Sequence, residues 1–122
     1  MATERPTFHE AWYRVADLKP RLLSNVRVYR QRFRGRLWHV LENSSNNKFS
    51  RLSQEAYYFI GLLDGQRTVA RTWQICNRQQ GDKAPTQSEV IELLGQLYSS
   101  NLLYAELPPD TASLFNRYTR RM

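Results

Sequence analysis

Apolar and polar positions alternate along the first half of the chain, the pattern typical of β-strands. Residues 26–33 (VRVYRQRF) and residues 37–42 (LWHVLE) flank a glycine at position 35. Because glycine adopts positive φ at no steric cost, Gly35 predicts the turn of a β-hairpin. A third short strand is expected over residues 48–52, after the Asn- and Ser-rich loop ENSSNN. Three strands in this order predict an antiparallel meander whose third strand lies at an edge.

Beyond residue 53 the apolar positions recur at helical spacing instead. Residues suited to N-caps precede three predicted helices: Ser53, Thr68 and Thr86. Residues suited to end the same helices follow each of them: Gly65, Gly81 and Asn101. Gly65 is expected in a left-handed C-cap, and Thr86 with Glu89 predicts a capping box.

The segments outside these elements complete the predicted organisation. Residues 1–25 are expected to form an irregular N-terminal arm, and LLYAEL, which ends at residue 107, a short extended wing. After Pro108 and Pro109, residues 108–122 predict a C-terminal helix or a linker toward a segment outside this chain. The predicted fold class is α+β: a winged-helix domain over residues 26–107, with an N-terminal three-stranded antiparallel sheet, three helices, a short wing and a C-terminal helix.

Composition indicates one globular domain. The chain has 122 residues, of which 41% are hydrophobic, and no apolar run approaches the roughly 18 residues that span a bilayer. The N-terminus has no apolar signal region. Cys76 is the one cysteine, so no internal disulfide can form, which fits a cytoplasmic location.

Positive charge is concentrated on the predicted hairpin. The chain carries a net charge of +7. Five arginines follow one another with no acidic residue among them: Arg27, Arg30, Arg32, Arg34 and Arg36. Such a patch can face nucleic acid, anionic lipid or an acidic peptide, and it can equally be a solvated strand face.

Residues for catalysis or metal binding are sparse. His9 and His39 are the two histidines, and the motifs of zinc peptidases, redox dithiols and phosphate-binding loops are absent from the sequence. A metal site would need His9, His39 and Cys76 to converge from three distant segments. Cys76 is instead expected to be a small buried apolar residue. We expect no enzyme activity, no metal and no cofactor.

Two motifs between Arg51 and Trp73 carry a resemblance to a known family. RLSQEAYYFIGLLDG and RTVARTW are similar to the PqqD-like family, the peptide-recognition elements (RiPP recognition elements) of ribosomal peptide maturation. The resemblance covers residues 26–107. It is to the variant found at the cytoplasmic N-terminus of site-2-protease-type membrane zinc peptidases, whose zinc-binding and membrane segments this sequence lacks.

The resemblance implies a function and a site. It implies a non-catalytic domain at the cytoplasmic face of the inner membrane that binds an extended peptide or a segment of a partner protein. The peptide would add as a strand beside the third strand, in a groove against the third helix. The implied edge residues are Lys48, Phe49, Ser50 and Arg51, and the implied groove wall is Ile91, Gly95 and Tyr98.

Each part of this site has an alternative interpretation. Gly95 can instead mark a place where another helix of the same domain packs closely. Lys48 and Arg51 can be charges that protect a sheet edge from aggregation.

DNA binding by a winged-helix transcriptional regulator is the rival function. The predicted third helix, TQSEVIELLGQLYSSN, contains two glutamates and neither Lys nor Arg. Because phosphate contacts supply most non-specific affinity, this helix is a poor recognition helix, and we expect no sequence-specific nucleic acid partner. A purely structural docking domain is the third possibility, and it overlaps with peptide binding.

Overall fold

The predicted three-stranded sheet is present in the computed structural model, which describes residues 7–119. It consists of β2 (Val26–Phe33), β3 (Arg36–Asn43) and β4 (Phe49–Leu52), antiparallel and in the order β2-β3-β4. Arg34 and Gly35 both have positive φ, 53° and 76°, and form the two-residue turn of the hairpin. The third strand begins at Phe49 and not at Lys48, because the Lys48 N–H donates to the Asn46 side chain at 2.9 Å.

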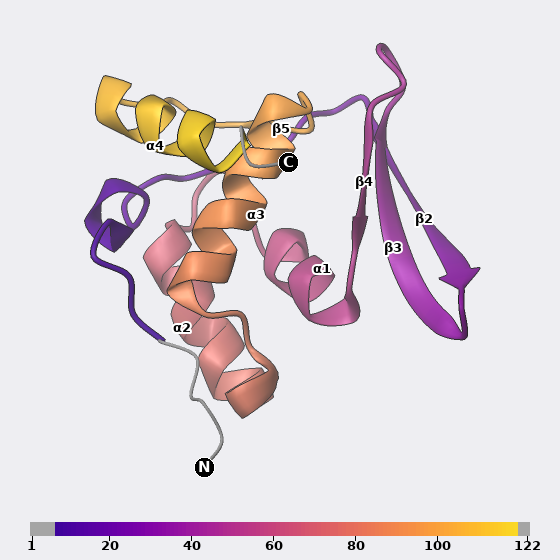
Figure 1. Cartoon of the computed structure of the whole chain (residues 1–122), viewed down its shortest axis with the longest axis horizontal. Coiled ribbons are helices and arrows are strands. Elements are labelled where there is room, and N and C mark those ends of the chain that lie inside the picture. The colour runs from indigo at the N-terminus through magenta and orange to yellow at the C-terminus, as the bar shows by residue number, and fades with distance from the viewer. Residues whose placement is uncertain (1–6, 120–122) are drawn as a thin grey trace.

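Four helices follow the sheet: α1 (Gln54–Gly61), α2 (Val69–Gln80), α3 (Gln87–Ser99) and α4 (Pro109–Thr119). The N-caps predicted at Ser53, Thr68 and Thr86 are confirmed, since each side chain accepts the backbone N–H three residues later. The capping box between Thr86 and Glu89 is also present. The helices lie on one side of the sheet, and α1 lies nearest to it (Figure 1).

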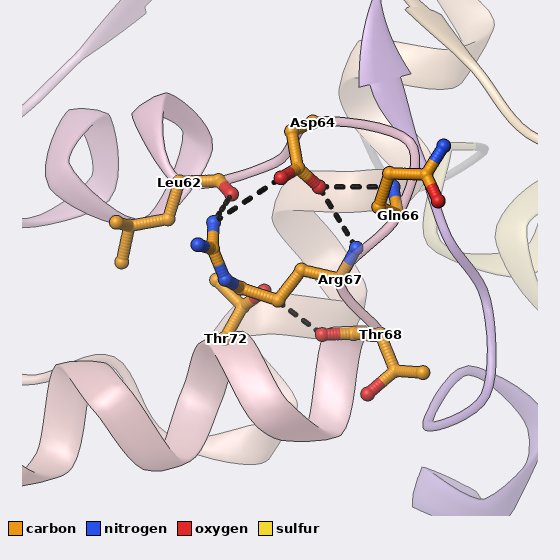
Figure 2. Close-up of polar contacts among 6 residues, drawn as sticks. All are labelled: Leu62, Asp64, Gln66, Arg67, Thr68 and Thr72. Atoms are coloured by element: carbon orange, nitrogen blue, oxygen red, sulfur yellow. Dashed lines mark hydrogen bonds and ion pairs between the residues drawn. The ribbon is translucent and has the colours of Figure 1, made fainter.

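The end predicted for the first helix is wrong by one turn. α1 ends at Gly61, and Gly65 takes its positive φ of 81° in the loop that follows. Figure 2 shows the cause: the Asp64 carboxylate accepts the N–H groups of Gln66 at 2.9 Å and Arg67 at 2.8 Å. The Arg67 guanidinium donates to the Leu62 carbonyl and pairs with Asp64 at 3.7 Å. Side-chain bonds therefore organise this loop after the helix has ended.

The N-terminal segment is more regular than predicted, and it pairs with the predicted wing. The segment contains a 3-10 turn, η1 (Trp12–Arg14), and a two-residue strand, β1 (Arg21–Leu22). β5 (Leu103–Tyr104), within the expected wing, pairs antiparallel with β1 in a separate two-stranded sheet. β5 ends before Pro108 and Pro109, which have no backbone N–H to donate to a ladder.

The core lies between the helix-facing side of the sheet and the helices. Leu41 of β3 and Leu52 of β4 are buried in it together with Phe59 and Ile60 of α1. α3 passes through the middle, with seven buried residues: Gln87, Val90, Ile91, Leu93, Leu94, Gly95 and Leu97. The N-terminal segment adds Ala11, Val15 and Leu18. The predicted α+β class is confirmed, whereas the winged-helix arrangement remains a prediction.

Candidate functional site

The edge strand β4 presents two different sets of side chains. Ser50 and Leu52 are each 4% exposed and point toward the helices, whereas Phe49 is 56% exposed and Arg51 is also exposed. The alternation follows from the two-residue period of a strand. One face of β4 is therefore packed in the core, and the side chains of the other face are exposed to solvent.

The backbone of β4 alternates in the same way between its neighbour and the open edge. The Asn43 N–H donates to the Lys48 carbonyl at 2.8 Å, and the register pairs Leu41 with Ser50. Because bonded and non-bonded pairs alternate in an antiparallel ladder, Ser50 bonds to β3 while the N–H and C=O of Phe49 and Arg51 face outward. Outside the strand ladders, no backbone hydrogen bond within residues 7–119 involves Phe49 or Arg51.

A shallow hollow of about 570 Å³ adjoins the C-terminal end of this edge. It lies among β4, the start of α1 and one flank of α3. Its lining consists of Trp38, Arg51, Leu52, Ser53, Glu55, Ala56, Lys83, Glu89, Glu92, Leu93 and Gln96. Two cations and three carboxylates meet there, so the hollow suits a polar or mixed-charge occupant.

The structure does not bring the predicted groove wall to the β4 edge. Ile91 is completely buried, and an ideal Cβ at Gly95 would lie 3.4–3.5 Å from Phe115 of α4. The Tyr98 ring also approaches Phe115, with 6.0 Å between ring centroids. This face of α3 is covered by α4, which confirms the alternative that Gly95 packs against another helix.

The flank of α3 that lines the hollow is the one carrying Glu89, Leu93 and Gln96. These positions recur at i, i+4 and i+7, as Ile91, Gly95 and Tyr98 do, so periodicity alone could not separate the two flanks. One feature of the sequence could have indicated which flank of α3 is covered: the apolar pair Leu114 and Phe115 in the last helix. Both are buried, and their burial requires a complementary surface such as the one at Gly95.

Trp38 is a further lining residue that the sequence analysis missed. Its indole Nε1 is buried and has no hydrogen-bond partner among the described residues. The Arg36 guanidinium lies over its ring, 4.7 Å from the centroid. A buried polar group without a partner is uncommon and needs an explanation, such as a ligand or an ordered water.

The histidine and cysteine side chains that could serve catalysis or bind a metal lie in separate elements. The His39 ring stacks on Tyr57, with 4.1 Å between centroids and 4° between planes. Cys76 is buried in α2, and burial raises the pKa of its thiol to about 11. Within residues 7–119, no three His, Cys, Asp or Glu side chains come together as a metal site. None of the described helices is both long and apolar enough to cross a bilayer.

Comparison of the chain with protein-family models, curated proteins and solved structures finds no match. The similarity to the PqqD-like family therefore rests on the motifs between Arg51 and Trp73, and what it implies remains a prediction.

Proposed function

We propose that this chain is a non-catalytic docking domain that captures an extended peptide, or an extended segment of a partner protein, by strand addition at β4. The observation that carries the proposal is the outward-facing backbone of Phe49 and Arg51 beside the hollow. An open edge offers donors and acceptors in the geometry that an added strand satisfies. The resemblance supplies the expected context, a cytosolic recognition module of a membrane metalloprotease-like or peptide-maturation and export system.

Side chains of the bound peptide would enter the hollow beside the C-terminal end of β4. Arg51 and Lys83 can pair with acidic side chains of the peptide, and Glu55 and Glu92 with basic ones. Main-chain bonds would thus supply affinity, and the hollow would supply selectivity.

DNA binding through α3 receives no support from the packing. Seven of its residues are buried, and α4 covers one flank. A recognition helix must instead present side chains along an accessible face to enter the major groove.

Two proline substitutions test strand addition at adjacent residues. Ser50→Pro removes a donor of the β3–β4 ladder and is expected to unfold or strongly destabilise the domain. Phe49→Pro removes an outward donor, which edge strands tolerate. It should leave the circular dichroism spectrum and melting temperature largely unchanged. It should also weaken peptide binding roughly two- to tenfold, since one hydrogen bond contributes about 0.5–1.5 kcal/mol.

The probe is a set of peptides selected on the wild-type protein from a random display library, with affinity measured by fluorescence anisotropy. Phe49→Ala is the matched control, because it removes the same side chain and keeps the N–H. If the selected peptides bind folded Phe49→Pro as tightly as Phe49→Ala, or if selection yields no binder, the strand-addition proposal is wrong.

A further inference from the structure

The net positive charge of the chain is concentrated on the three-stranded sheet. Residues 26–52 contain seven cationic side chains and one acidic side chain, Glu42, so six of the seven net charges lie there. The rest of the chain has eleven cations and ten acids and is nearly neutral. Charge that serves solubility alone needs no such segregation, and a concentrated patch points to an anionic partner.

The arginines surround the β2–β3 hairpin on all sides. Arg30 and Arg32 pair with His39 and Leu37 and share the helix-facing side of the sheet, while Arg36 lies on the opposite side. Every residue of β2 after Val26 is exposed, so both of its faces are open. The end of the hairpin that carries the turn lies away from α2 and α4 (Figure 1).

These charges are mostly uncompensated. Among the described residues, Arg27 of the hairpin forms an ion pair, with Glu42 at 3.6 Å. Four guanidiniums have no carboxylate within ion-pair distance in the part of the chain that the structure describes: Arg30, Arg32, Arg34 and Arg36.

Aromatic rings lie on the side of the sheet that faces away from α1, opposite the side of Arg30 and Arg32. Tyr29 is 41% exposed and Phe33 is 44% exposed, and Trp38 and Phe49 share their side. The guanidiniums of Arg34 and Arg51 lie 5.2 and 5.0 Å from the Phe33 ring centroid. Rings and planar guanidiniums are the two kinds of surface on which unpaired bases stack.

We propose that this arginine-aromatic sheet (residues 26–52) binds single-stranded nucleic acid without sequence preference. The arginines neutralise phosphates, and Tyr29 and Phe33 stack on bases. A duplex offers its phosphates to the arginines but no free base faces to the aromatic rings, because neighbouring bases already cover them. A flat anionic bilayer would meet the cations of one face, whereas a flexible strand reaches both faces and the turn. The proposal does not depend on the peptide-binding function and does not involve α3.

The test measures binding of a labelled oligothymidine of about 15 nucleotides, a duplex of equal length, and phosphatidylserine-containing vesicles. Oligothymidine is expected to bind more tightly than the duplex. Tyr29→Ala and Phe33→Ala should each weaken oligothymidine binding roughly tenfold, since stacking contributes about 1–3 kcal/mol per base. The double variant Arg30→Gln/Arg32→Gln should reduce the slope of log affinity against log salt by about 1.4.

Two controls match these variants elsewhere on the molecule. Tyr104→Ala removes an exposed ring that also lies beneath a guanidinium, that of Arg21, 5.0 Å from its centroid. Arg71→Gln/Arg78→Gln removes two exposed cations from α2. Both controls should keep at least half of the wild-type affinity for oligothymidine, and circular dichroism verifies the fold of every variant.

Four results would overturn the proposal. Equal affinity for duplex and oligothymidine would mean that the sheet attracts nucleic acid through its positive charge alone, without stacking on bases. Unchanged affinity for oligothymidine in folded Phe33→Ala and Tyr29→Ala would mean the same. Binding to vesicles without binding to oligothymidine would identify the sheet as a membrane contact. Absence of binding to all three probes would leave the charged sheet without a polyanionic partner and refute the inference.

Discussion

Substitution of Gly95 tests how closely α3 and α4 pack. An ideal Cβ at this position lies 3.4–3.5 Å from side-chain and backbone atoms of Phe115, within ordinary contact. Gly95→Ala should therefore fit and raise the free energy of unfolding by up to about 1 kcal/mol, because alanine favours the helix. Gly95→Leu places further carbon atoms where Phe115 is already packed, and overpacking costs about 1–3 kcal/mol. After a gain in helix propensity of up to about 1 kcal/mol, a net loss of about 0–2 kcal/mol relative to the wild type is expected.

Thermal unfolding measures this difference. With an unfolding entropy of about 2.1 cal/mol/K per residue, 1 kcal/mol corresponds to roughly 4 °C for a chain of 122 residues. Gly95→Leu should then melt up to about 8 °C below the wild type, and about 4–12 °C below a Gly→Leu control that has the same gain in helix propensity without the overpacking. Gly61→Leu is the matched control, because Gly61 is an exposed helical glycine whose ideal Cβ has no heavy atom of the described residues within 4 Å apart from the neighbouring backbone of its own helix, and it should lose no stability. Urea midpoints at unchanged m-value provide an independent measure.

The result that would refute this reasoning is equal stability of Gly95→Leu and Gly61→Leu. Gly95 would then face open space, as the predicted peptide groove required, and α4 would not cover this face of α3.

Two further predictions concern titratable groups. Hydrogen bonds from the backbone N–H groups of Arg67 and Gln66 lower the pKa of Asp64, so its charge stabilises the fold above about pH 4 and this contribution is lost as pH falls through the lowered pKa. Asp64→Asn should therefore be less stable than the wild type near neutral pH, with the difference shrinking in acid, and a difference independent of pH would contradict this account. Since the buried Cys76 thiol has a pKa raised to about 11, the folded protein should resist alkylation by iodoacetamide at about pH 8, and urea should expose the thiol. The same shift should reduce stability as pH rises above about 8.5, and rapid stoichiometric labelling of the folded chain would refute the burial of Cys76.

Local features of the fold were predictable because their causes lie within a few residues. Ser53, Thr68 and Thr86 cap helices through bonds to N–H groups three residues away, and Gly35 forms a turn between adjacent strands. Gly65 shows where this reasoning fails. A glycine after an Asp is a good helix end, but Asp64 and Arg67 organise the loop through their own side chains and α1 ends earlier.

The sequence predicted which strand of the candidate site lies at the sheet edge, but not which flank of α3 lies beside it. The order of three strands places β4 at an edge, and a period of two separates Phe49 from Ser50. The two flanks of α3 have the same i, i+4, i+7 spacing, so the choice between them depends on where α4 packs. In the structure, Gly95 packs against Phe115 of α4. Glu89, Leu93 and Gln96, on the other flank of α3, line the hollow.

The sequence by itself therefore determined the α+β class, the meander, the helix caps and the concentration of arginine between residues 26 and 36. Each of these follows from short-range backbone preferences or from composition. Only the tertiary structure decided that β5 pairs with β1 across about 80 residues, that α4 covers Gly95, and that the guanidiniums of Arg34 and Arg51 lie over the Phe33 ring. These contacts join segments that are distant in the chain, and their free energy depends on the packing of surfaces that no local pattern specifies.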